Sequence, residues 1–76
     1  MNCLILLNKV RLAHERFKEE NLIYKYCNFG GIIDIKVTEE GYEVEINNYT
    51  NMGQRQPYEN YPYTVKVIDE KIIFIK

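Results

Sequence analysis

Several residue types that build common active sites are scarce or missing in this sequence of 76 residues. Serine and tryptophan are absent, and histidine and alanine each occur once, as His14 and Ala13. A histidine acting as a general base needs a nucleophile or a second acid within hydrogen-bond reach, and no motif here supplies one. The pair His14-Glu15 does not begin a zinc-protease motif, because position 18 is lysine. We therefore predict that the protein is not an enzyme.

Metal ligands and phosphate-binding motifs are equally sparse. Two cysteines and one histidine fall short of the usual Cys/His count of a zinc site. The glycine pair at residues 30–31 matches neither common phosphate-binding pattern and indicates a turn or a helix end. We predict no metal and no cofactor.

The two cysteines also bear on the cellular compartment. Cys3 and Cys27 are not part of a C-x-x-C motif, and their number is typical of reduced thiols rather than of a disulfide framework. The apolar run at residues 3–7 is too short for the central region of a signal peptide. A spanning helix needs about 20 apolar residues, and no such stretch occurs. We expect a cytoplasmic protein that does not contact membranes.

Length and charge further restrict the number of domains and the kind of binding partner. A chain of 76 residues forms one domain, residues 1–76, and its hydrophobic fraction of 46% is typical of a folded protein. The net charge is −1 and the isoelectric point is about 5.8. This balance argues against general affinity for nucleic acids or anionic membranes, which depends on clustered lysine and arginine.

The first segment has the period of an amphipathic helix. Apolar residues recur at steps of three and four and form one stripe: Cys3, Leu6, Val10, Ala13 and Phe17. Asn2 precedes the stripe and is a suitable N-cap. We predict a helix to about residue 20, with residues 22–27 either continuing it or forming a strand or turn.

From residue 31 the period changes to two. Residues 33–37 and 42–46 alternate apolar and polar side chains, and residues 38–41 fit a turn with Gly41 at positive φ. The resulting hairpin pairs Val37 with Tyr42, Ile35 with Val44 and Ile33 with Ile46, which puts all the apolar residues on one face.

The other face of this hairpin gathers the carboxylates Asp34, Glu43 and Glu45. Asp34 is expected opposite Glu45, and Lys36 opposite Glu43. Because the lysine compensates part of the negative charge, we interpret this face as solvated rather than as a cation site.

A second hairpin is predicted from residues 63–68 and 72–75, with a turn near residues 69–71. Residues 50–62 contain both prolines, follow neither period and are expected to form a long loop. The predicted fold is α+β: one N-terminal helix packed on a four-stranded antiparallel sheet made of two hairpins, αββββ.

The last strand contains more apolar residues than one helix can cover. Residues 72–75 are all large and apolar, so two of them point away from the helix in any register. Pairing Val67 with Ile73 gives a far face of Ile68, Ile72 and Phe74. Pairing Val67 with Ile72 gives a far face of Ile68, Ile73 and Ile75. Burial of apolar surface stabilises a protein by about 25 cal/mol per Å², so leaving such a face in water would forfeit a large part of the stability. Three covers are available: the loop at residues 50–62, a second copy of the chain or another protein.

The loop is rich in tyrosine and includes Arg55, two residue types that are enriched at binding hot spots. Together with the first of the two registers, it defines a predicted partner-binding set: Arg55, Tyr58, Tyr61, Tyr63, Ile68, Ile72 and Phe74. The leading hypothesis is a small non-enzymatic interaction protein that binds another protein or itself as a homodimer. By size and composition alone it is similar to accessory proteins of phages or mobile elements that inhibit a host enzyme.

The alternative is a small nucleic-acid-binding or regulatory module. It would use the loop tyrosines for stacking and a basic helix face for phosphate contacts, namely Lys9, Arg11, Arg16 and Lys18. Glutamates accompany these cations along the helix, which makes nucleic acid the less favoured partner.

Overall fold

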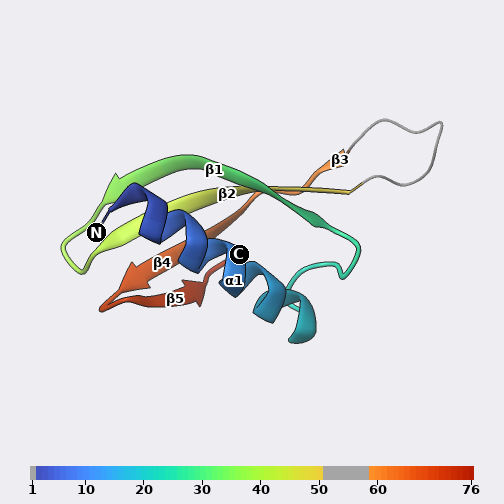
Figure 1. Cartoon of the computed structure of the whole chain (residues 1–76), viewed down its shortest axis with the longest axis horizontal. Helices are drawn as coiled ribbons and strands as arrows, with labels where there is room; N and C mark the ends of the chain where they lie inside the picture. Colours follow the sequence, from blue (N-terminus) through green and yellow to red (C-terminus); the bar gives the residue numbers. More distant parts are fainter. Residues whose placement is uncertain (1, 51–58) are drawn as a thin grey trace.

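A computed structural model describes residues 2–50 and 59–76 of the chain. The elements in chain order are α1 (Cys3–Glu19), β1 (Asn28–Val37), β2 (Tyr42–Thr50), β3 (Glu59–Asn60), β4 (Tyr63–Ile68) and β5 (Lys71–Phe74). As Figure 1 shows, α1 lies across one face of an antiparallel sheet with the strand order β1-β2-β4-β5. The short β3 pairs with the C-terminal end of β2, beyond the part of β2 that pairs with β4. The predicted α+β fold with an N-terminal helix is confirmed.

The helix has the predicted start and end. The backbone N–H of Leu4 donates to Asn2 Oδ1 at 2.7 Å, which is the expected cap. The chain leaves the helix at Asn21, whose φ is 61°, and the following residues form turns rather than more helix or a strand. None of the helical segments in the described part of the chain has the length and apolar character needed to cross a membrane.

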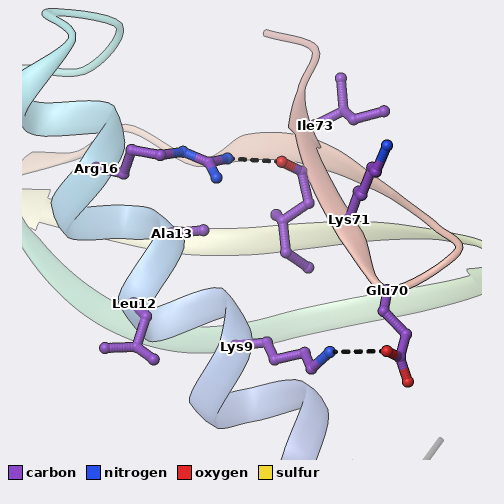
Figure 2. A pocket seen from close by; sticks show the side chains of 8 residues that line it. Lys9, Leu12, Ala13, Arg16, Glu70, Lys71 and Ile73 are labelled. Atoms are coloured by element: carbon purple, nitrogen blue, oxygen red, sulfur yellow. Dashed lines mark hydrogen bonds and ion pairs between the residues drawn. The ribbon is translucent and has the colours of Figure 1, made fainter.

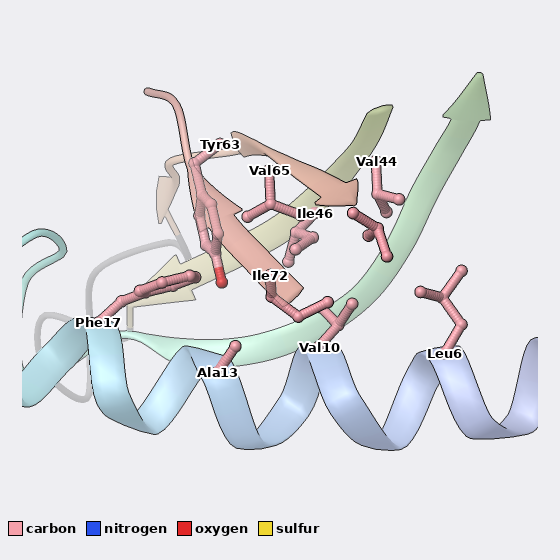
Figure 3. Packing of buried hydrophobic residues seen from close by; sticks show 10 residues of the cluster. Leu6, Val10, Ala13, Phe17, Val44, Ile46, Tyr63, Val65 and Ile72 are labelled. Atoms are coloured by element: carbon pink, nitrogen blue, oxygen red, sulfur yellow. The ribbon is translucent and has the colours of Figure 1, made fainter. Parts of the chain in front are cut away.

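The core lies between α1 and the sheet face that it covers. Leu6, Val10, Ala13 and Phe17 of the predicted stripe point at buried strand residues (Figure 3), which are Val44, Ile46, Tyr63, Val65, Val67 and Ile72. Cys3 is exposed, contrary to the predicted stripe, because the buried part of α1 begins one turn later, at Leu6.

The first hairpin keeps the predicted register near its turn and departs from it at the other end. Val37 pairs with Tyr42 and Ile35 with Val44, as predicted. Ile46, however, pairs with Ile32 rather than with Ile33, because β1 contains an extra residue in a bulge. Ile33 is consequently displaced and remains 52% exposed.

The second hairpin adopts the register in which Val67 pairs with Ile72. Alternation then turns Ile72 and Phe74 toward α1, where the ring of Phe74 lies 5.3 Å from that of Phe17. The predicted position of Ile72 and Phe74 on the far face is therefore wrong, since only alternate residues of β5 can lie there. The far face receives Ile68, Ile73 and Ile75 instead.

The predicted loop at residues 50–62 is interrupted by regular structure. Thr50 belongs to β2 and pairs with Glu59 of β3, and the Tyr61 N–H donates to the Asn48 carbonyl at 2.6 Å. The structure thus extends the sheet into a segment that was expected to be irregular. Two residues of the predicted partner-binding set, Arg55 and Tyr58, lie outside the described residues.

Candidate binding groove between the helix and the last strand

Strand β5 occupies one edge of the sheet, and no described strand pairs with its outer side. The N–H of Ile75 donates to the carbonyl of Thr64 at 3.0 Å, so Ile75 directs its backbone toward β4. By alternation, Ile72 and Phe74 direct their N–H and C=O groups away from β4. Helix α1 lies beside this outer edge (Figure 2).

A groove of about 520 Å³ separates α1 from β5. Ala13 and Ile72 line its inner part and are only 6% and 8% exposed. Leu12 and Ile73 line its outer part and are 72% and 46% exposed. Ala13 contributes only a methyl group to this lining.

Charged side chains surround the groove and give it a positive balance. Lys9 Nζ lies 3.8 Å from the carboxylate of Glu70, the one acidic residue among its described lining residues. Arg16 Nη2 donates to the carbonyl oxygen of Ile72 at 2.7 Å, and Lys71 stands at the start of β5. Arg16 is also 3.9 Å from Glu20 across the helix surface, an exposed pair that contributes little. The lining therefore carries three cations and one carboxylate.

The structure separates the predicted partner-binding residues. Ile72 lines the groove, Ile68 is partly buried on the far face, and Phe74 is partly buried against the core. Tyr61 is half exposed, and its hydroxyl donates to the Glu59 carboxylate, a bond that raises the pKa of Tyr61. These side chains do not form one continuous surface.

Tyr63 is a core residue rather than a contact residue. Its hydroxyl shares a hydrogen bond of 2.8 Å with Nδ1 of His14, and the two rings stack with centroids 5.9 Å apart. Burial raises the pKa of the Tyr63 hydroxyl. Burial also lowers the pKa of His14, although the backbone of Cys27 opposes this by favouring the protonated ring. Burial therefore favours the neutral forms of both groups.

The four helix cations of the nucleic-acid alternative do not lie on one face. Lys9 and Arg16 line the groove, whereas Lys18 Nζ donates to the carbonyl of Cys27 at 3.3 Å on another side of the helix. Arg11 donates to Asn8 Oδ1 at 3.0 Å, and a rotation of 100° per residue places it near Lys18. A continuous basic face for phosphates is therefore not formed by α1.

The acidic face of the first hairpin has the predicted pairs. Asp34 lies opposite Glu45 and Lys36 opposite Glu43. Glu43 in turn pairs with Lys66 of β4, so the charges alternate in this row, whereas Asp34 and Glu45 place two carboxylates opposite each other. This arrangement is typical of a solvated sheet face.

Sequence reasoning missed most of the groove. Five of its described residues were in neither predicted contact set: Leu12, Ala13, Glu70, Lys71 and Ile73. One signal was available, because the lone alanine of the chain lies in the middle of the helix stripe, where a small side chain leaves room. Comparison with known proteins adds nothing here, since no protein-family model, curated protein or solved structure matches the chain.

Proposed function

We propose that the protein is a small non-enzymatic interaction module that binds an extended, acidic segment of a partner protein along the outer edge of β5. The observation that carries the proposal is the outward-facing backbone of Ile72 and Phe74 beside the α1/β5 groove. Addition of a strand to an exposed sheet edge is a common mode of peptide recognition, in which main-chain hydrogen bonds give affinity.

Strand addition also provides a cover for the far face. Side chains of an added strand alternate between the two faces of the sheet. Those on one side enter the groove near Leu12 and Ala13, and those on the other side lie against Ile73 and Ile75, which are 46% and 40% exposed. One bound segment would thus bury the apolar residues that α1 leaves uncovered.

The charges around the groove define the partner segment. Lys9, Arg16 and Lys71 outnumber the single carboxylate of Glu70, so acidic side chains are favoured on the groove side. Arg16 engages the Ile72 carbonyl with one of its donors and retains others for a partner carboxylate. We infer a segment that alternates acidic residues toward the groove with apolar residues toward Ile73 and Ile75.

The groove and its cations also favour β5 over β1, the strand at the opposite edge of the sheet. β1 is longer, and its apolar residues Ile35 and Val37 are also exposed. The cavity beside β1 is lined by Asp34 and Lys36 together with Glu43 and Glu45 of β2, so carboxylates rather than cations gather there. A homodimer built on the β1 edge is therefore the less favoured arrangement.

The cellular compartment and the kind of interaction are inferred from the sequence alone. We propose that the module acts in the cytoplasm, with both thiols reduced. Inhibition of a host enzyme by a phage or mobile-element protein is the form of interaction that size and composition favour.

The test uses a short blocked peptide that alternates glutamate and valine, titrated into the ¹⁵N-labelled protein and followed by NMR. We expect binding with shifts at β5 and α1, and no binding of the matched lysine/valine peptide. Arg16→Glu should weaken binding about tenfold or more, because charge-assisted hydrogen bonds contribute about 1.5–3 kcal/mol.

Arg11→Glu is the matched control, since it makes the same charge change on a side of α1 away from the groove. It should leave the affinity nearly unchanged. Equal weakening by both substitutions, or equal binding of the two peptides, would contradict the proposal.

A further inference from the structure

A second cavity, of about 380 Å³, lies at the opposite end of the core from the helix N-terminus. The turn after α1 provides Leu22 and Ile23, and the ends of the strands provide Asn48 and Phe74. Its size is within the range of pockets that hold small molecules, roughly 300–1,000 Å³. It shares no residue with the described lining of the α1/β5 groove.

Four of the ten described residues in the wall of this cavity are aromatic. Tyr24, Tyr61 and Tyr63 line it together with Phe74. The hydroxyls of Tyr61 and Tyr63 already have partners in Glu59 and His14, so these residues contribute ring surface rather than free polar groups. Lys76 also lines the cavity and disfavours a cationic ligand. Flat, uncharged aromatic rings stack well on such a wall.

One polar atom in the wall lacks a partner. Asn48 is 2% exposed, and its Oδ1 has no hydrogen bond within the described residues. Its backbone is fixed, because the Asn48 carbonyl accepts a hydrogen bond from the Tyr61 N–H and Phe29 pairs with it across the sheet. Buried acceptors in native proteins are nearly always satisfied, by protein, water or ligand.

From these observations we infer that the cavity binds a flat, uncharged aromatic ring that donates an N–H hydrogen bond to Asn48 Oδ1. The ring lies among Tyr24, Tyr61 and Phe74, and its N–H satisfies the acceptor that the described residues leave open. This site is independent of the peptide groove, so either can fail without the other.

The experiment compares indole with 1-methylindole, which differ in the N–H donor alone, by NMR titration of the full chain. Indole should bind more tightly by about threefold to tenfold, the ratio expected for one net hydrogen bond. In Asn48→Leu, where the side chain with the unpaired Oδ1 is replaced by an apolar one of similar size, the two compounds should bind equally. Absence of indole binding, or discrimination that persists in Asn48→Leu, overturns the inference.

The two thiols give a second readout that locates the ligand. Cys27 is 1% exposed and lines the cavity, whereas Cys3 is exposed at the start of α1 and serves as an internal control. Saturating indole should slow alkylation of Cys27 by iodoacetamide and leave Cys3 unaffected. An unchanged Cys27 rate also overturns the inference. Weaker binding of N-acetyltryptophanamide than of indole identifies a free heterocycle as the source of the ring, and equal binding identifies a tryptophan side chain.

Discussion

At the scale of single residues, the only histidine of the chain, His14, forms a buried pair with Tyr63. His14 is fully buried, its Nδ1 bonds Tyr63, and burial outweighs the bond by which the Cys27 backbone favours the protonated ring. Protonation would leave a charge in an apolar setting, with Lys18 adding to the cost and Glu15 opposing it. The ring therefore favours its neutral form.

This arrangement predicts a pH-dependent stability. Because burial lowers the pKa of His14 below its usual 6.5, the unfolded chain binds a proton more readily than the folded chain under that pH. The stabilising contribution is complete above about pH 6.5 and is lost as the pH falls toward the folded-state pKa. Urea unfolding between about pH 5 and pH 7.5 should show the free energy of unfolding falling on the acid side.

The control for this prediction is His14→Gln, which cannot titrate. It should be less stable than the wild type at neutral pH, yet its free energy of unfolding should vary less over the same window. If the two proteins show the same pH dependence, the titrating group is a carboxylate rather than His14.

At the scale of secondary structure elements, regular periods made the helix and the first hairpin predictable. The apolar stripe from Leu6 to Phe17 is uninterrupted, which identifies the helix. Gly41 marks the turn of the first hairpin, and the turn sets the register of the strand residues next to it. The bulge in β1 could not be predicted, because Ile32 and Ile33 are both apolar and alternation cannot distinguish them. The register of β5 was undetermined for the same reason.

The register of β5 is set by its turn rather than by its apolar residues. Ile68 pairs with Lys71, which leaves Asp69 and Glu70 as a two-residue turn with φ values of 49° and 65°. Such turns usually carry Asn-Gly or Asp-Gly. The sequence Asp-Glu lacks that signal, which is why the pairing of Val67 with Ile72 was only one of two alternatives.

The glycines of β1 and its turn provide an element-scale prediction. Gly41 has a φ of 157°, and a Cβ there would collide with the backbone carbonyl oxygen of Val67 in β4. Gly41→Ala should therefore lower the free energy of unfolding by about 2 kcal/mol or more. Gly31 has a φ of 95° but open space around it, so Gly31→Ala should cost only about 1–2 kcal/mol.

Urea unfolding of both variants measures this difference. The paired design separates steric collision from backbone conformation, since both positions have positive φ. If Gly31→Ala proves as destabilising as Gly41→Ala, the close approach of the first turn to β4 is not what requires glycine there.

At the scale of the whole molecule, the sequence correctly indicated a surplus of apolar side chains near the C-terminus but not where they meet a partner. The surplus is real, because Ile73 and Ile75 are partly exposed on the far face. The groove could not be predicted, because it joins Arg16 and Ile72, which are 56 positions apart. Their contact depends on β5 being an edge strand beside α1, a property of the assembled sheet.

The proposed interaction requires β5 to be the edge that receives a partner strand. Amide hydrogen exchange, measured with and without the glutamate/valine peptide, tests this directly. The peptide should slow exchange at the outward amides of Ile72 and Phe74 and leave those of Ile35 and Val37 on the β1 edge unchanged. Protection along β1, or none at Ile72 and Phe74 despite saturating peptide, would contradict it.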